Sequence, residues 1–227
     1  MHFYSDPSGP VGILGGTFDP VHYGHLRAAV EVYEKLGLDE VRMLPSARPP
    51  HRETPAASAE HRLAMLERAT SCQDYLVPDD SELRRDGPSW MVDTLSGFRQ
   101  QFGDRPLVMV VGQDAANGLD GWHEWRRLFE LAHIAVMRRP DAESDYREEL
   151  AECMRSRRAE SPAELAKAPA GRVLPVAITQ LEISSTAIRE AVAAGRSPLY
   201  LTPPPVIDYI REQGLYACCL LYTSPSP

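Results

Sequence analysis

The N-terminal part of the chain carries the pattern that most limits its fold. A short apolar segment, VGIL at 11–14, runs directly into Gly15 and Gly16, and a helical pattern extends from Leu26 to a stop at Gly37. A second strand pattern, VRMLP, follows from Val41. A strand, a glycine turn, a helix and another strand form the repeating unit of a parallel sheet, so the sequence predicts an α/β fold.

The same alternation continues along the chain. Helices are predicted at 59–70, 91–102 and 122–131, and strands at 107–111, 134–137 and 173–178. The charged, alanine-rich stretch 141–171 is interpreted as a solvated helix and loop. Two more helices, near 186–194 and 205–213, would form a small C-terminal helical part.

The 227 residues suffice for one large domain and would crowd two. We assign 11–216 to this domain, with 186–216 as its helical part, and 1–10 to an N-terminal extension. The end, ACCLLYTSPSP at 217–227, changes in character after Gly214-Leu215-Tyr216. We predict a disordered or non-native tail there.

Composition excludes several classes of partner. The formal charge of −8 argues against a broad basic surface for nucleic acid or anionic lipid. No segment reaches the roughly 18 apolar residues of a membrane helix, and residues 1–10 have no basic region followed by an apolar run, so we expect no export. The four cysteines lack the spacing of a zinc or redox site. We expect a cytoplasmic protein, a monomer or homodimer, without nucleic-acid or membrane partners.

The motif GGTFDPVHYGH at 15–25 lies where an α/β sheet binds its ligands, between the end of a strand and the start of a helix. Gly15 and Gly16 let backbone approach a phosphate, and the helix start favours an anion. His22 and His25 are three residues apart, so both face the same way and suit hydrogen bonding to phosphoryl oxygens. The alternatives are a helix-capping segment with merely polar histidines, or a two-histidine metal site.

A second motif, ISSTAIR at 183–189, places hydroxyl residues before a helix and Arg189 three residues after Thr186. One interpretation is an N-cap, because Ser184, Ser185 or Thr186 can each accept a hydrogen bond from an N–H of the first helical turn. The other is a phosphate site built from backbone donors, hydroxyls and one guanidinium. Both can hold together.

The first motif resembles, over its whole length, the signature of the HxGH nucleotidylyltransferases, and ISSTAIR follows it at long range as in that superfamily. The resemblance implies that His22, His25 and Arg189 are catalytic, and that Mg²⁺ accompanies ATP. It implies direct attack of a substrate phosphate on the α-phosphorus, without a covalent intermediate. The resemblance also implies which residues bind ATP: His22, His25 and Arg189, together with Gly15, Gly16, Thr17, Phe18, Ser184, Ser185 and Thr186.

Further segments narrow the resemblance to bacterial nicotinate-nucleotide adenylyltransferases. PSARPPHR at 45–52 is similar to that family's proline-rich substrate loop, which implies His51 and Arg52 near substrate, although the family usually has Lys in place of Arg52. A rigid surface loop is the alternative.

GPSWMVDTL at 87–95 resembles the segment that holds the pyridine ring, with Trp90 and Met91 replacing the commoner Tyr and Thr. This departure leaves base selectivity open.

GQDAANGLDGWHEW at 112–125 matches the same family's next motif. The resemblance implies that Asp114 accepts hydrogen bonds from ribose hydroxyls and that Trp122, beside His123, stacks on the pyridine. The alternative for Trp122 is simple core packing, which is also our interpretation of Trp125. HRLAMLERA at 61–69 is interpreted as a packing helix without chemistry, and Arg138-Arg139 as solvated.

Together these features predict a Rossmann-like doubly wound parallel sheet with a small C-terminal helical part. The predicted reaction is adenylyl transfer from ATP to nicotinate mononucleotide, giving deamido-NAD and pyrophosphate. Phosphopantetheine adenylyltransferase or another HxGH enzyme, such as a cytidylyltransferase, is the alternative within the superfamily. A nucleotide sensor without catalysis is the alternative outside it.

Overall fold

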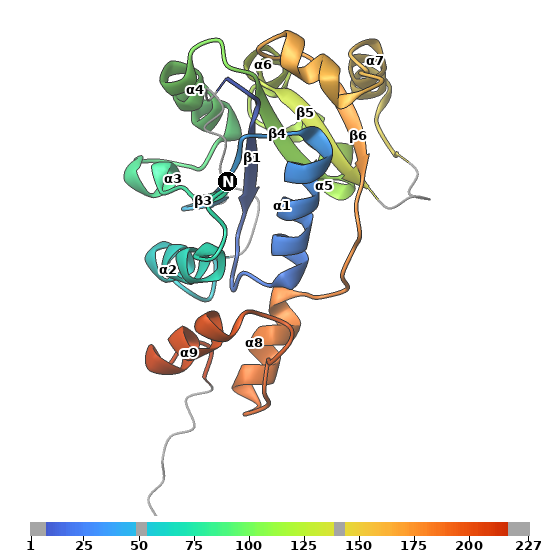
Figure 1. Ribbon diagram of the computed structural model, residues 1–227. Coiled ribbons are helices and arrows are strands. Elements are labelled where there is room, and N and C mark those ends of the chain that lie inside the picture. The colour runs from blue at the N-terminus through green and yellow to red at the C-terminus, as the bar shows by residue number, and fades with distance from the viewer. Residues whose placement is uncertain (1–7, 49–53, 139–143, 218–227) are drawn as a thin grey trace, which may run out of the picture.

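The structure, a computed structural model, describes residues 8–48, 54–138 and 144–217. Its centre is a six-stranded sheet in which every neighbouring pair is parallel, in the order β3-β2-β1-β4-β5-β6 (Figure 1). The strands are β1 Val11–Gly16, β2 Glu40–Pro45, β3 Leu76–Pro78, β4 Leu107–Gly112, β5 His133–Arg138 and β6 Val173–Ala177. This strand order is that of a Rossmann fold and confirms the predicted doubly wound sheet.

The strand order fixes where ligands can bind. The chain runs outward from β1 to β2 and β3, then returns to place β4 on the other side of β1. In open parallel sheets of this kind, ligands bind beyond the carboxyl ends of the strands where the order reverses. Those ends are Gly16 of β1 and Gly112 of β4, so the first motif begins at the reversal point.

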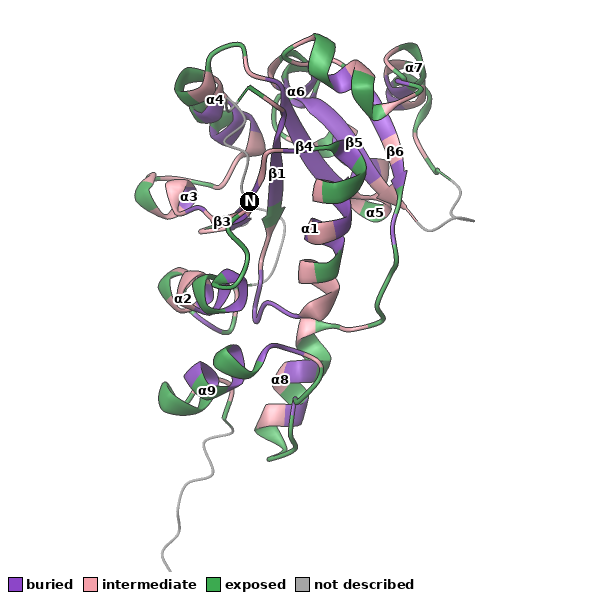
Figure 2. Cartoon of the chain, viewed as in Figure 1, coloured by how far each residue is buried: buried purple, intermediate pink, exposed green. Residues whose placement is uncertain are grey.

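Helices cover both faces of the sheet. On one face α1 (Tyr23–Leu36) and α2 (Ala59–Thr70) share a buried apolar cluster with the strands; on the other, α4 (Met91–Phe102), α6 (Trp125–Leu131) and α7 (Glu148–Ser156) share a second cluster. The strands between them are mostly buried, with their more exposed residues near the strand ends (Figure 2). None of the helices in the described ranges has the length and apolar character needed to cross a membrane.

Several elements differ from the prediction. Helix α1 begins at Tyr23 instead of Leu26. Helix α6 begins at Trp125 instead of Trp122, because a 3-10 turn, η1 (Leu119–Gly121), precedes it and Glu124 adopts a left-handed conformation with φ 49°. The short elements β3, α3 (Ser81–Arg84) and α5 (Gln113–Asn117) were not predicted, since three to five residues are too few to show a periodicity.

The interpretation of 141–171 as a solvated helix and loop is confirmed for much of its described part, which begins at 144, but it overlooked the apolar side chains. Helix α7 and a second 3-10 helix, η2 (Pro162–Lys167), each turn apolar side chains inward. Leu150, Met154 and Leu165 are all buried. These apolar residues are few and are separated by charged residues, so the sequence pattern did not reveal them.

The C-terminal part follows β6 as two helices, α8 (Ser185–Ala193) and α9 (Pro204–Glu212), close to the predicted positions. It packs at the end of the molecule where α1 begins (Figure 1). There the N–H of Tyr23 donates to the carbonyl of Leu201 at 3.1 Å, and the Thr202 hydroxyl donates to the carbonyl of Val21 at 2.7 Å. The tail beyond Ala217 lies outside the described residues.

Candidate active site

The first motif forms the turn between β1 and α1. A Cβ atom on Gly16 would lie 2.9 Å from the ring of Phe18, so only glycine fits beside this buried aromatic side chain. Phe18 itself adopts a left-handed conformation with φ 51° and packs edge-on against the ring of His25, with 5.0 Å between ring centroids. The turn is therefore shaped by packing as well as by glycine.

His22 and His25 form a stacked pair at the start of α1. His22 is the N-cap residue and His25 lies in the first turn; their ring centroids are 3.6 Å apart and the planes are inclined by 23°. Nδ1 of His25 accepts a hydrogen bond from the backbone N–H of His22 at 3.3 Å. In the neutral ring, the proton of His25 is therefore on Nε2, which makes that nitrogen a donor.

Burial controls the charge of His22. His22 is 6% exposed, and burial lowers its pKa from 6.5 to about 4, so the ring is neutral at pH 7. Its Nδ1 atom is buried and makes no hydrogen bond within the described part of the chain. A buried polar atom without a partner is uncommon in native proteins and suits a site that a ligand completes.

The second motif meets the first in space. Ser184 caps α8 by accepting a hydrogen bond from the N–H of Ala187 at 3.1 Å, which confirms the N-cap interpretation. The Ser185 hydroxyl donates to the carbonyl of Pro20 at 2.9 Å. Arg189 donates to the carbonyl of Asp19 at 2.8 Å and to the Thr186 hydroxyl at 3.2 Å. These bonds hold α8 against the turn that precedes the histidines.

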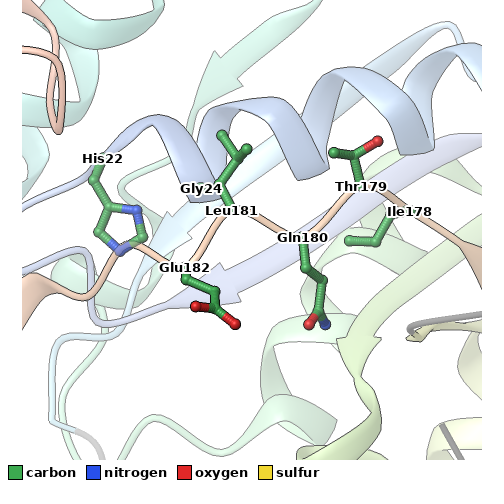
Figure 3. Close-up of a pocket in the computed structure, with 7 residues that line it drawn as sticks. All are labelled: His22, Gly24, Ile178, Thr179, Gln180, Leu181 and Glu182. Carbon is green, nitrogen blue, oxygen red and sulfur yellow. The ribbon is translucent and has the colours of Figure 1, made fainter. Parts of the chain in front are cut away.

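A pocket of about 280 Å³ opens beside His22 (Figure 3). Gly24 and the segment 178–182 complete its lining. Figure 3 shows this segment running alongside the first turns of α1. Glu31 of α1 fixes the segment by accepting a hydrogen bond from the N–H of Thr179 at 3.0 Å, and Lys35 donates to the carbonyl of Ala177.

The segments that resemble a pyridine-nucleotide site come together on the other side of the turn. The rings of Trp90 and His123 lie 4.9 Å apart. The methyl carbon of Met91 lies 3.1 Å from where a Cβ on Gly15 would stand, so this residue directly adjoins the end of β1. Trp122 is partly buried against the same apolar cluster, whereas Asp114 is exposed at the start of α5.

Ser89 ties two of these segments together. Its hydroxyl oxygen accepts hydrogen bonds from the N–H groups of Ala47 and Arg48, each at 3.1 Å, and its own N–H donates to the carbonyl of Arg48 at 3.2 Å. The predicted substrate residues His51 and Arg52, which follow in this loop, lie outside the described residues. Trp125 is buried as predicted.

Sequence reasoning missed two buried charged residues. The Asp19 carboxylate accepts hydrogen bonds from the N–H groups of Ala56 and Ala57, at 2.7 and 3.2 Å, and from the Tyr216 hydroxyl at 2.7 Å. Arg62 is 1% exposed, although 61–69 was interpreted as packing alone. Its position in the stripe formed with Met65, Leu66 and Ala69 was the available signal, because an arginine in an apolar stripe requires buried acceptors.

The described side chains do not form a metal-binding cluster of their own. Among the residues that the structure describes, no group of three or more His, Cys, Asp or Glu side chains is placed to hold a metal. The Asp19 carboxylate is already occupied by three hydrogen bonds. Mg²⁺ commonly keeps several waters and binds phosphate oxygens. A Mg²⁺ ion at this site would then be held chiefly by the phosphate oxygens of a bound nucleotide.

Comparisons with known proteins agree with this geometry. The cytidylyltransferase-like family matches residues 13–191. A protein of Methylococcus capsulatus named probable nicotinate-nucleotide adenylyltransferase is 51% identical over 208 residues, covering 91% of this chain and 99% of that protein. A protein of the same name from Aeromonas hydrophila is 45% identical over 207 residues, covering 91% and 97%.

Among solved structures, a Plasmodium falciparum nicotinic acid mononucleotide adenylyltransferase complexed with NaAD has a TM-score of 0.68 at 16% identity. The match covers 92% of this chain and 97% of that one, which supports the fold. Family and fold thus point the same way as the two joined motifs. The chain belongs to the cytidylyltransferase-like family and, within it, to the nicotinate-nucleotide adenylyltransferases.

Proposed function

We propose that this protein transfers AMP from ATP to nicotinate mononucleotide, producing deamido-NAD and pyrophosphate for NAD synthesis. The observation that carries the proposal is the stacked pair of His22 and His25 at the start of α1, next to a pocket and directly after a turn that ISSTAIR contacts. Imidazole donors at a helix N-terminus suit a triphosphate better than a neutral ligand. A two-histidine metal site is less well supported, because stacked rings cannot both direct nitrogens at one ion.

We assign the donor nucleotide to the pocket beside His22. Its triphosphate would lie across the N-terminus of α1, within reach of the glycine turn from Gly15 to Phe18. Ser184, Ser185 and Thr186, at the start of α8, would offer hydroxyl and backbone groups from the opposite side. Arg189 is 29% exposed, so part of its guanidinium remains available to phosphate.

The chemical step would be a direct displacement. An oxygen of the nicotinate mononucleotide phosphate attacks the α-phosphorus of ATP, a new P–O bond forms, and the bond to the β-phosphate oxygen breaks to release pyrophosphate. His22 and His25 would donate hydrogen bonds to oxygens whose negative charge grows in the transition state, and Arg189 would add a fixed positive charge. Mg²⁺ on the triphosphate would neutralise the departing pyrophosphate.

We assign the acceptor to the side formed by Trp90, Met91 and Trp122. The paired rings of Trp90 and His123 offer a flat aromatic surface for a pyridine. Asp114 is exposed and can accept hydrogen bonds from ribose hydroxyls. His51 and Arg52 would bind the acceptor from the proline-rich loop. We further propose that the enzyme works in the cytoplasm as a monomer or homodimer, without nucleic-acid partners.

The test is pyrophosphate release by the purified protein with ATP and Mg²⁺. Nicotinate mononucleotide, nicotinamide mononucleotide and phosphopantetheine are compared as acceptors. We expect the highest kcat/KM with nicotinate mononucleotide. Preference for nicotinamide mononucleotide would contradict the proposed acceptor, and turnover with phosphopantetheine alone would favour the alternative enzyme.

Replacement of His25 separates catalysis from sensing. We expect His25→Ala to lower kcat by about 100-fold or more, because it removes a donor to the transition state. Its affinity for ATP should change by less than about tenfold, since most ground-state contacts remain. Equal losses of turnover and affinity, or a wild-type protein that binds ATP and turns over no acceptor, would favour the sensor.

A further inference from the structure

Arg62, on α2, is the largest side chain in the described part of the chain that is almost wholly buried. Buried arginines normally pair with a carboxylate. Arg62 makes no ion pair across the residues that the structure describes; it donates to backbone carbonyls instead. Burial lowers the pKa of its guanidinium below the ordinary value, yet arginine remains charged.

The three acceptors belong to three different segments. Nη1 donates to the carbonyl of Thr17 at 2.8 Å, Nη2 to that of Ser46 at 2.7 Å, and Nε to that of Ala57 at 3.2 Å. Thr17 lies in the turn assigned to the donor nucleotide. Ser46 begins the proline-rich loop assigned to the acceptor, and Ala57 follows that loop.

The planar fork of the guanidinium sets the distances between these segments. Its nitrogens are fixed relative to one another, so three carbonyls bound to them cannot move independently. Two further contacts strengthen the junction: Asp19 accepts hydrogen bonds from Ala56 and Ala57, and Ser89 accepts from Ala47 and Arg48. Both ends of the acceptor loop are therefore fastened, and Arg62 joins both to the donor turn.

We propose that Arg62 is a positioning residue that sets the separation of the bound donor and acceptor, so that the attacking phosphate oxygen meets the α-phosphorus in line. The inference rests on the proposed function, which assigns one substrate to each loop. Its physical basis is the steep dependence of such reactions on geometry: a misplacement of about 1 Å can cost about 100-fold in rate. Arg62 touches neither substrate in this scheme and acts through the two loops.

A matched control comes from Arg99, on α4. It also donates to backbone carbonyls, those of Gly103, Arg105, Leu131 and Pro169. These acceptors precede or flank the amino ends of β4 and β5, away from the strand ends that carry the site. Loss of Arg99 should therefore reduce stability without altering the geometry of transfer.

The experiment compares Arg62→Lys, Arg62→Met and Arg99→Lys in the full chain. For each variant, Tm, kcat and both KM values are measured. Equilibrium binding of an ATP analogue with a methylene bridge between the α- and β-phosphorus is measured as well. We expect Arg62→Met to lower kcat by about 100-fold and Arg62→Lys, which keeps the charge but loses the fork, by about tenfold. Analogue affinity should stay within about threefold of wild type.

Arg99→Lys should lower Tm while leaving kcat within about twofold. Three results would overturn the inference. The first is a kcat near wild type in the Arg62 variants, and the second is a fall in their analogue affinity proportional to the fall in kcat. The third is a fall in kcat of Arg99→Lys that accompanies its fall in Tm. If Arg62→Met does not fold, Arg62→Lys decides the question by the same criteria. A wild-type protein without turnover would overturn the proposed function and this inference together, whereas active wild type with fully active variants overturns only the role of Arg62.

Discussion

Gly24 lies between the two stacked histidines, and the space around it is limited. A Cβ at this position would stand 3.0 Å from the His22 ring and 3.4 Å from the carbonyl of Leu181. Contacts this short require a neighbour to move by a few tenths of an ångström. The neighbour that can move is the imidazole, because the other is backbone.

We expect Gly24→Ala to lower kcat by about tenfold, because the His22 ring is displaced from its place beside the pocket. Gly97→Ala on α4 is the control: this glycine is exposed, has nothing within 4 Å of its added Cβ, and should stabilise its helix by roughly 0.5–1 kcal/mol with unchanged kcat. Pyrophosphate release and urea denaturation measure both effects. Full activity in Gly24→Ala would contradict this expectation, because it would show that the His22 ring accommodates the added methyl group without leaving its place beside the pocket.

At the residue scale, the sequence singled out side chains whose chemistry suits phosphate and missed those that hold the backbone around them. His22, His25 and Arg189 are candidates because their chemistry and spacing suit phosphate. Asp19 and Arg62 bind backbone groups from segments distant along the chain. No local pattern reveals such partners, because they are set by tertiary contacts alone.

At the scale of elements, α1 does more than present its N-terminus. Glu31 lies in the middle of the helix, accepts hydrogen bonds from Arg27 and Lys35, and also holds the N–H of Thr179. Burial alone would raise its pKa, but the bonds from Lys35 and Thr179 outweigh it and lower the pKa to about 2. The carboxylate thus fastens the helix to the segment that lines the pocket.

We expect Glu31→Gln to cost about 2 kcal/mol at pH 7, because charge-assisted bonds are lost. A carboxyl whose folded pKa is about 2 and whose ordinary pKa is 4.5 stabilises fully above pH 4.5, and this stabilisation disappears as the pH falls through 2. Urea denaturation at pH 7, 5 and 3 should therefore show the two proteins converging toward acid. Glu34→Gln, on the exposed side of α1, should differ little at any pH.

The long, periodic elements were predictable and the short ones were not. Most long elements lie close to their predicted positions: strands β1, β2, β4, β5 and β6 and helices α1, α2, α4, α8 and α9. The helices show apolar residues that repeat over several turns, and the strands show apolar side chains that point alternately toward the helix layers on the two faces of the sheet. Helix α6 was placed three residues early. The later start is due to Glu124, whose backbone is left-handed. This conformation cannot be predicted from the sequence, because residues other than glycine rarely adopt it.

At the scale of the whole molecule, the site joins regions far apart in the chain. The first motif contacts α8 through Ser185 and Arg189, and Tyr216 reaches back to Asp19. Burial and the neighbouring Asp19 both raise the pKa of Tyr216, so its hydroxyl remains a donor. The predicted tail begins at the next residue.

We expect removal of residues 217–227 to leave Tm within about 1 °C of the full chain. Tyr216→Phe should lower Tm by roughly 4–8 °C, because a hydrogen bond to a buried carboxylate is lost in a domain of this size. Thermal unfolding monitored by circular dichroism measures both. A drop of several degrees on removing residues 217–227 would contradict this prediction.

The three tryptophans all lie on one side of the turn between β1 and α1. Trp90 and Trp122 are partly buried and Trp125 is buried, and all three pack with the apolar cluster of α4 and α6. The pocket beside His22 contains none. Intrinsic fluorescence of this protein therefore reports on that side of the turn alone: a pyridine stacked near Trp90 would quench it, whereas ATP alone would leave it nearly unchanged. The order of substrate addition can then be followed without a label.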